Sequence, residues 1–327
     1  MKYSLLTVLV VGAFFAGAQG SFFYLDLPSS ARINALGGYG VSQENQDLSL
    51  LFHNPALIDS VDKGTFSTWF NPFFADIRRM AGAYKATLPV VGAMSFGVVF
   101  MDYGTMTGAD PAGQVTSEFH SREYLLQLAK SHASGPFTMG AGIKLAGSYL
   151  AGYGSTALLA DVGGVYHVPE KDMTVGLVLK NFGVVISRYQ TTLGRQVPLD
   201  VQIGTTFKPQ FMPFRYSFTV FDVGRPLQPF YIGAESAPSL FTKVMRYVNV
   251  GGELILGEHL ELQIGYNQRR RQELSLAGGA FGAGLSFGFL LKLKQLSINF
   301  SRSVYHAAGG TSFISLQGNF NHRKKIF

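Results

Sequence analysis

Hydrophobic and polar residues alternate along most of this chain, in segments of about ten residues that end at turn-forming residues. In the segment 260–267, Leu260, Leu262 and Ile264 alternate with Glu261 and Gln263. Alternation places successive side chains on opposite faces of a strand, so one face of each segment is apolar and the other is polar. The pattern predicts fourteen strands, at 64–71, 77–89, 92–103, 122–132, 136–150, 156–167, 173–182, 197–207, 213–223, 244–256, 260–272, 279–291, 295–306 and 311–322.

The connections between the predicted strands sort by their order along the chain. Every second connection is tight: 133–135, 168–172, 208–212, 257–259 and 292–294. Three of the others are long: 104–121, 183–196 and 224–243. In an up-and-down barrel alternate connections share a rim, so the long ones would lie together at one rim and the tight ones at the other. A Greek-key sandwich also alternates along its strands, but it would not sort its connections in this way.

The composition indicates that the predicted strands form a membrane barrel. Only 14% of the residues are charged, against about 25% in an average soluble domain. After the leader, no stretch approaches the ~20 apolar residues of a transmembrane helix. A chain this apolar meets lipid only as a closed barrel, because every backbone polar group must be paired there. We therefore predict an all-β fold, a 14-stranded antiparallel transmembrane β-barrel over residues 64–327 with a short N-terminal hatch.

The two ends of the chain agree with export to the cell outer membrane of a Gram-negative bacterium. Residues 1–20 form a signal peptide with Lys2, an apolar run at 5–15 and small residues before Ser21. An uncleaved anchor is the alternative, for which the run is short. Phe327 is the usual last residue of an outer-membrane barrel, although the basic residues 323–325 separate it from the last predicted strand. The chain has no cysteine, hence no disulfide framework.

Residues 21–63 do not fit the strand pattern and are predicted to form a hatch, or plug, that enters the lumen. Ser29 or Ser30 would cap a short helix that ends at a glycine pair, and an Asn-Pro pair further on favours a turn. A fourteen-stranded lumen is too wide for wall side chains to fill. The alternative is a mobile periplasmic tail. The residues that define the hatch are Gly37, Gly38, Asn54, Pro55 and Ala56.

The formal net charge of +7 favours an anionic partner. Nucleic acid is not expected, because the basic residues are scattered and an exported protein does not meet the genome. Lipopolysaccharide is the expected source of anions. Arg269, Arg270 and Arg271 fall near the outer end of a predicted strand, where outward arginines would pair with its phosphates. A solvated loop run is the alternative.

The long connection 224–243 is the best candidate for a protein-docking surface. Its aromatic and proline residues include Pro226, Pro229, Phe230, Tyr231 and Phe241. Aromatic anchors dominate the energetics of protein interfaces, and prolines hold them in place. The alternative is a lid folded over the barrel mouth.

Charged residues at inward positions form a second set of candidates. Lys144, Arg215, Glu253 and Glu261 all fall on the polar face of predicted strands. Water or partner charges can reach a barrel lumen, so these residues are expected to form a structural network there.

No catalytic residue, metal site or cofactor site is predicted. Residues 284–288 match the G-x-S-x-G pattern, but that motif needs a strand-to-helix turn and here it lies within an alternating segment. The seven histidines are dispersed and show no metal-ligand spacing. The chain is therefore not expected to be an enzyme.

Several motifs resemble those of known outer-membrane barrels. Fourteen strands behind a hatch with Asn54-Pro55-Ala56 resemble the long-chain fatty-acid transporter-like (FadL-like) barrels. A narrower likeness covers nearly the whole mature chain in order and is to the PorQ-like barrels, in the PorV/PorQ group of the type IX secretion system of Bacteroidetes. The motifs that carry it are 27–32, 35–38, 100–104, 179–183, 251–253, 265–267 with Arg271 and Glu273, and 303–306 with Gly309.

The resemblance implies a non-enzymatic component of protein secretion. PorQ-like barrels belong to the machinery that attaches cargo to lipopolysaccharide at the cell surface. That machinery includes a sortase-like peptidase, PorV and the surface protein PorZ, and a PorQ-like barrel would hold a PorZ-like protein through its extracellular loops. The wider superfamily implies a different function, the passive uptake of a hydrophobic small molecule. That function predicts an apolar pocket under the outer loops, a movable hatch and a lateral gap in the wall.

Overall fold

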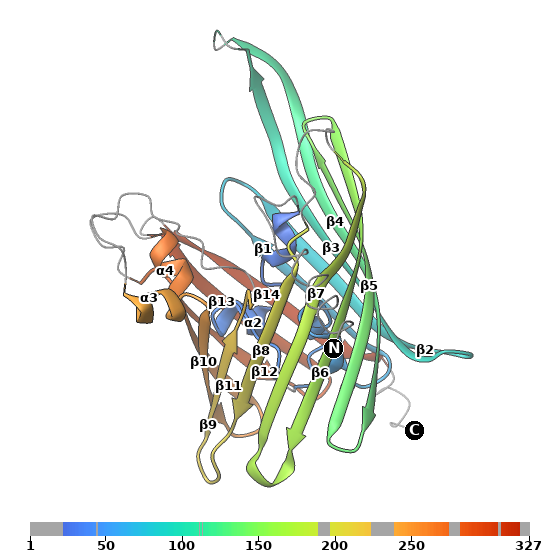
Figure 1. Cartoon of the computed structure of the whole chain (residues 1–327), viewed down its shortest axis with the longest axis vertical. Coiled ribbons are helices and arrows are strands. Elements are labelled where there is room, and N and C mark those ends of the chain that lie inside the picture. Colours follow the sequence, from blue (N-terminus) through green and yellow to red (C-terminus); the bar gives the residue numbers. More distant parts are fainter. Residues whose placement is uncertain are drawn as a thin grey trace, which may run out of the picture.

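Fourteen antiparallel strands close into one barrel in the computed structural model (Figure 1), which describes residues 22–43, 45–110, 112, 114–188, 197–223, 239–274, 282–306 and 309–320. Each strand pairs with its neighbours in sequence, and β1 pairs with β14 to complete the cylinder. The predicted fold class is confirmed. The strands are β1 (Thr65–Pro72), β2 (Arg78–Leu88), β3 (Gly92–Ala109), β4 (Val115–Ser134), β5 (Phe137–Leu150), β6 (Tyr153–Val168), β7 (Met173–Ser187), β8 (Asp200–Phe207), β9 (Phe214–Val220), β10 (Val248–Leu256), β11 (Leu260–Asn267), β12 (Leu285–Lys292), β13 (Leu296–His306) and β14 (Gly309–Asn319).

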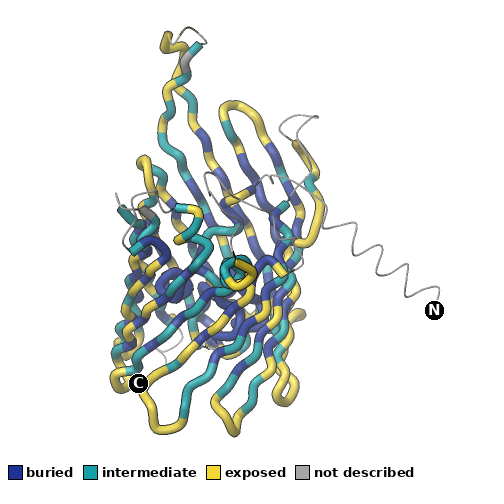
Figure 2. Tube along the Cα trace, turned by 60° about the vertical axis from the view of Figure 1, so that its left-hand side comes forward, coloured by how far each residue is buried: buried dark blue, intermediate teal, exposed yellow. Residues whose placement is uncertain are grey.

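The barrel wall is apolar outside and largely polar inside, the reverse of a soluble domain. On β11, Leu262 and Ile264 are exposed whereas Glu261 and Gln263 are buried, as the alternation predicts. Buried and exposed residues alternate in the same way along the other walls (Figure 2). This inversion is typical of a barrel whose outer face contacts lipid and whose lumen holds polar groups.

Aromatic residues on β5 and β6, called the two girdles below, bound the apolar band on the outer face of these strands. At the end with the tight connections, the rings of Phe137 and Tyr166 lie 4.7 Å apart on β5 and β6. At the other end, Tyr149 and Tyr153 are both exposed. From Phe137 to Tyr149 there are twelve residue steps, which at ~3.4 Å each along a strand tilted by ~45° span about 29 Å. The band therefore matches the hydrocarbon core of a bilayer, which is about 30 Å thick.

The helices of the described residues are short, and none of them is long and apolar enough to cross a membrane. They are η1 (Phe23–Asp26), α2 (Ala31–Ala35), η2 (Leu48–Phe52), η3 (Pro55–Ile58), η4 (Pro169–Lys171), α3 (Leu240–Met245) and α4 (Gln268–Leu274).

Residues 22–63, called the plug below, lie inside the barrel (Figures 1 and 2). Apolar plug residues, among them Leu48, Leu51 and Phe52, pack in one cluster with the inward-facing Trp69 and Phe313 of the wall. The segment is thus seated in the lumen rather than hanging below it as a tail. The leader 1–20 and the C-terminal residues 321–327 lie outside the described residues.

The wall is much taller on one side than on the other, which the sequence analysis missed. β3 has 18 residues and β4 has 20, so the predicted long loop 104–121 is mostly strand. Beyond Asp102 and Arg122 these two strands pair only with each other among the described residues, and they rise above the rim as a two-stranded ribbon (Figure 1). Glycines and β-bulges at both ends of the ribbon break the alternation, which is why the sequence indicated a loop there.

Other strand boundaries also differ from the predicted ones. β7 continues to Ser187, so the predicted loop 183–196 begins later. β11 ends at Asn267, and the predicted extension to 272 is the helix α4, because its run of arginine and glutamine lacks alternation and favours a helix. β12 begins only at Leu285, because Gly282 and Gly284 adopt left-handed backbone angles that end regular pairing.

We expect that Ile143→Arg will lower the free energy of unfolding by about 2–4 kcal/mol, the cost of a charge on the lipid face at mid-bilayer. Ile143 is the midpoint of the β5 segment between the two girdles, and its side chain is 57% exposed. Thr116→Arg, in the exposed ribbon above the band, is the matched control and should be nearly neutral. Urea unfolding of the barrel in lipid vesicles measures both. Equal stability of the two variants would contradict the assignment of the band.

Candidate functional site

The first turn of the plug is built as the sequence predicts. Ser30 caps helix α2, and its hydroxyl accepts a hydrogen bond from the backbone N–H of Ile33 at 3.4 Å. The helix ends at Gly37 and Gly38, whose φ angles of +100° and +106° are strained for any residue with a Cβ. The N–H of Gly38 donates to the carbonyl of Ile33 at 2.8 Å, which satisfies an orphan carbonyl at the helix end.

Asn54 links two parts of the plug. Its Oδ1 accepts from the N–H of Ala56 at 3.0 Å and caps η3, while its Nδ2 donates to the carbonyl of Val41 at 2.8 Å. Pro55 occupies the first turn of η3, where its missing N–H costs no hydrogen bond. The Asn-Pro-Ala motif therefore forms a turn and a helix cap, and its asparagine links the backbone of Val41 to that of Ala56.

The plug rests directly on glycines of the wall. At eight inward glycines, an added Cβ would lie between 1.9 and 3.0 Å from an atom of the plug, at or below the closest distance that real Cβ atoms show. Three pairs of them face each other across neighbouring strands: Gly140 with Gly163, Gly176 with Gly204, and Gly251 with Gly265. We call this set the glycine belt; its members are Gly97, Gly140, Gly163, Gly176, Gly204, Gly251, Gly265 and Gly288.

Three belt glycines, Gly140, Gly176 and Gly265, face backbone atoms of the plug, and the other five face plug side chains. A Cβ at Gly140 would lie 2.3 Å from the carbonyl carbon of Pro55, and one at Gly265 would lie 2.1 Å from that of Leu36. A Cβ at Gly163 would lie 1.9 Å from Oδ1 of Asn54. No sequence motif predicted the belt, although the chain's 39 glycines, many at inward strand positions, were its visible signal.

A buried charge cluster fixes α2 to the wall at β10 and β11. Arg32, which is 1% exposed, forms ion pairs with Glu253 on β10 and, at 3.2 Å, with Glu261 on β11. Arg215 pairs with Glu253 at 3.2 Å, and Lys292 pairs with Glu261. Burial alone would lower the pKa of Arg32, but the two carboxylates outweigh it and raise the pKa above its ordinary value. We call these five residues the Arg32 cluster.

Three of the four lumen residues predicted from sequence therefore meet in the Arg32 cluster. The fourth, Lys144, lies elsewhere in the lumen, where it pairs with Asp161 at 2.5 Å and donates to Oδ1 of Asn181 at 3.0 Å. Arg32 itself was missed, because its partners lie more than 200 residues away and no local spacing points to them.

The plug is also held where it joins the wall. The ammonium of Lys85 on β2 donates to the carbonyls of Ile58 at 2.7 Å, Asp59 at 3.2 Å and Val61 at 2.7 Å. Three carbonyls satisfy all three protons of one ammonium, so a buried lysine is stable here without a carboxylate. Lys85 therefore clamps the segment that leads from η3 into β1.

Arg269 and Arg270 make contacts within the protein, at the barrel mouth. Arg269 pairs with Asp222, and with Glu273 at 3.1 Å. Arg270 lies over the ring of Tyr305, 4.3 Å from its centroid, and donates to Ser286 at 3.2 Å.

Arg271, on the same helix α4, is exposed. Since two of the three arginines have protein partners, the lipopolysaccharide contact predicted for this run stays a prediction that rests mainly on Arg271.

An aromatic stack closes the plug against the mouth. Tyr39 stacks face to face on Phe221, with ring centroids 3.7 Å apart, and the guanidinium of Arg269 lies 5.8 Å from the Phe221 centroid. Burial raises the pKa of Tyr39 well above its usual range, so the phenol stays neutral. Tyr39 thus joins the plug to the connections at the upper rim, a role that no sequence motif indicated.

The predicted docking loop is only partly described. Pro226, Pro229, Phe230 and Tyr231 lie outside the described residues. Phe241 lies on α3 and is 73% exposed. Two further apolar residues of the same helix, Leu240 and Val244, are also exposed. The described part of the loop therefore offers an apolar helix face at the low side of the rim.

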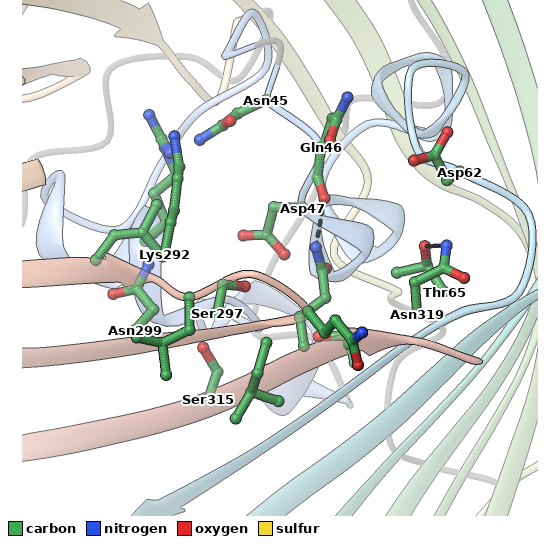
Figure 3. Close-up of a pocket in the computed structure, with 18 of the residues that line it drawn as sticks. Asn45, Gln46, Asp47, Asp62, Thr65, Lys292, Ser297, Asn299, Ser315 and Asn319 are labelled. Atoms are coloured by element: carbon green, nitrogen blue, oxygen red, sulfur yellow. Dashed lines mark hydrogen bonds between the residues drawn. The ribbon is translucent and has the colours of Figure 1, made fainter. Parts of the chain in front are cut away.

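A polar cavity of about 600 Å³ opens at the rim with the tight connections (Figure 3). Plug residues such as Asp47 and Asp62 face strand residues such as Asn299 and Asn319 across it. Gln317 crosses from wall to plug, since its Oε1 accepts from the N–H of Leu48 at 2.7 Å. Most of the residues that line this cavity carry amide, hydroxyl or charged groups, which can bind water and other polar groups.

The described residues contain no group of three or more side chains that could hold a metal ion. Ser286, the serine of the G-x-S-x-G pattern, is buried and its hydroxyl bonds to Ser303 at 2.9 Å and to Arg270. These partners give it a structural role in the wall below α4.

We expect Gly140→Ala to destabilise the barrel by about 1–3 kcal/mol, because the new methyl group overlaps plug backbone that has little room to move. Gly164→Ala is the matched control: Gly164 has no atom nearer than Thr138 O at 4.0 Å, so this change should stay within about 0.5 kcal/mol. Urea unfolding in vesicles gives the energies, and limited proteolysis reports exposure of the plug. A Gly140→Ala barrel as stable and protease-resistant as wild type would refute the belt.

We expect acid to weaken the plug through His53. Burial, and then the charges of Lys180, Lys144 and Arg79, hold the pKa of His53 well below its ordinary value. The unfolded chain takes up a proton as pH falls below ~6.5 while the folded one does not, so stability decreases by up to about 1.4 kcal/mol per pH unit. His53→Gln keeps an acceptor for the N–H of Ser29 and should reduce this loss between pH 6.5 and 4.5. Identical pH profiles for the two proteins would argue against the effect.

Solved structures share this architecture at low sequence identity. The TodX monoaromatic hydrocarbon channel, as a deltaS2 mutant, is 15% identical with a TM-score of 0.53 over 90% of this chain and 100% of that chain. A Pseudomonas aeruginosa FadL homologue is 11% identical with a TM-score of 0.48 over 89% of this chain and 98% of that chain. The sequence matches no family model and no curated protein. At this identity the likeness to TodX shows the fold alone, and that fold is the plugged barrel that the resemblance to the long-chain fatty-acid transporter-like proteins implies.

Proposed function

We propose that this protein is a non-enzymatic outer-membrane barrel of the type IX secretion system that anchors a surface partner of the cargo-attachment complex. The partner is a PorZ-like protein bound through the extracellular connections, with PorV and the sortase-like peptidase as further members of the complex and lipopolysaccharide as the surrounding lipid. The sequence motifs that resemble PorQ-like barrels motivate this function. The apolar band about 29 Å tall supports the membrane location.

The observation that carries the proposal is the contact between the plug and the glycine belt. A conduit needs a plug that moves. Here plug backbone fits against bare glycines at Gly140, Gly176 and Gly265, and plug side chains fit against the belt glycines of five further strands, so the plug is in close contact with the wall on eight strands. The Arg32 cluster adds buried ion pairs, and breaking them would leave unpaired charges in the lumen. Such a plug suits a rigid anchor.

The shape of the upper rim supports the same function. The ribbon rises on one side, and its Met106 and Phe119 pair across the two strands on the face that continues the inward face of the wall. On the low side, α3 presents Leu240 and Phe241. A two-stranded ribbon is at best marginally stable alone in water, so contact with a partner protein would support it.

The second candidate is passive uptake of a hydrophobic small molecule, and the fold likeness to a hydrocarbon channel favours it. Uptake would also use a lateral gap in the wall. The β2–β3 pairing is continuous from Leu88 with Gly92 to Arg78 with Asp102, whereas the β6–β7 pairing shifts register between Ala160 and Val162. Binding of a radiolabelled long-chain fatty acid by the purified protein would favour uptake. Absence of such binding, together with loss of surface-bound cargo after deletion of the gene in the native host, would favour anchoring.

We expect Leu240→Asp with Phe241→Asp to lower capture of the PorZ-like protein from native membranes by about tenfold or more, because buried aromatic anchors of an interface are worth ~2 kcal/mol or more. Phe211→Asp is the matched control, since Phe211 is fully exposed but lies in the tight connection at the opposite rim. Quantitative affinity purification with a tagged barrel measures capture. Undiminished capture by the double variant would contradict the assignment of α3 as a docking surface.

A further inference from the structure

The outer wall carries an apolar groove that runs across five strands. Its volume is about 640 Å³, and it lies between two rows of outward side chains that are joined strand to strand by backbone pairing. One row is Tyr84, Phe96, Leu128 and Ile143, and the other is Gly82, Val98, Leu126, Leu145 and Leu158. The rows are two residues apart along each strand, which is about 7 Å, and five strands span about 19 Å. These dimensions fit an extended acyl chain.

The floor of the groove is backbone. Between the two rows runs a row of residues whose side chains point into the lumen, including Ala83, Gly97, Gln127 and Lys144, and these residues line the groove as well. Only their main chain can face outward, because side chains alternate across a strand. Gly82 deepens one end, where the nearest atom to an added Cβ is Val98 Cγ1 at 3.9 Å.

A charged row stands beyond the groove on the same strands, toward the loop end. Arg78, Asp102 and Arg122 are consecutive partners on β2, β3 and β4. Both arginines point outward, and each lies four residues, about 14 Å, from the groove row at Gly82 or Leu126.

This row holds two guanidinium groups but one carboxylate, that of Asp102. Asp102 lies 4.0 Å from Arg122, whose side chain is 57% exposed, and no ion pair to Arg78 occurs within the described part of the chain. One positive charge is therefore left over at this level of the wall. The two strands lie about 10 Å apart, so two arginine side chains can reach a single group between them. Guanidinium groups bind phosphate in a bidentate manner, which makes phosphate the matching anion.

We propose that this face of β2–β6 is a binding site for one phosphorylated lipid of the loop-end leaflet. The acyl chain lies in the groove, and the headgroup phosphate is held by Arg78 and Arg122. The site rests on the membrane location proposed above, but not on the surface partner. It differs in residues and in position from the run Arg269–Arg271, two of whose side chains are engaged at the mouth.

Native mass spectrometry of the delipidated full-length barrel with diphosphorylated lipid A tests the site. Wild type should retain one lipid per barrel. Arg78→Gln with Arg122→Gln should weaken retention by about tenfold or more, since two charge-assisted contacts are lost. Gly82→Leu should weaken it by filling the groove. Arg302→Gln is the matched control, because Arg302 is an exposed arginine on β13, outside the five strands of the groove, and should leave retention unchanged.

Two further ligands separate the possible sources of binding. Dephosphorylated lipid A should bind at least about tenfold more weakly if the phosphate is recognised. Millimolar inorganic phosphate should not displace lipid A if the acyl chain contributes. Equal retention by the double arginine variant, equal binding of the dephosphorylated lipid, or displacement by free phosphate would each overturn the site.

Failure of this site and failure of the membrane location give different results. A barrel that shows the heat-modifiable migration of a folded outer-membrane protein but retains no lipid A refutes the site alone. Recovery of the mature chain as a soluble monomer without detergent would refute the membrane location itself.

Discussion

The close approach of the plug to the barrel wall is the constraint on which the rest of this structure depends. It requires glycine at inward positions on eight strands. With the lumen filled there, charged residues of the wall lose contact with bulk water and need partners from the plug. Arg32 forms ion pairs with Glu253 and Glu261, and the Lys85 ammonium donates hydrogen bonds to three carbonyls. The inner chemistry of the barrel follows from how tightly the plug fits.

Much of the fold could be predicted because lipid imposes a simple rule on the outer face. Alternation along β9, β11 and β14 gave strands whose faces agree with the structure, since a polar residue on the lipid side is costly. Local rules also gave the Ser30 cap and the end of α2 at Gly37, because capping and left-handed backbone angles depend on neighbouring residues.

The predictions that were wrong fall where no such rule acts. The ribbon at 104–121 lies beyond the apolar band, so its alternation is weak and two bulges break it. The helix α4 replaced the end of a predicted strand for the same reason. Arg32 and the glycine belt depend on contacts between residues far apart in sequence, which spacing along the chain does not encode. The anchors expected in 224–243 fall largely outside the described residues.

The two candidate functions place opposite demands on the plug and the rim. Uptake needs a mobile plug and a lateral opening in the wall. Anchoring needs a fixed plug and a rim that extends toward the partner protein. The fit of the plug and the tall ribbon agree with anchoring. The likeness to TodX is one of architecture, and the same plugged cylinder can serve either task, since function resides in the site rather than in the fold.

Because of the glycine belt, the plug fits only a barrel whose strands pair in the native register. Side chains alternate with a period of two, so a slip of one residue on any belt strand would turn its glycine toward lipid. An outward residue, such as Leu177 next to Gly176, would then be driven into the main chain of the plug. A misaligned cylinder could not accept its own N-terminal segment. The segment that occupies the lumen thereby discriminates, during assembly, between the native pairing of the strands and its nearest competitors.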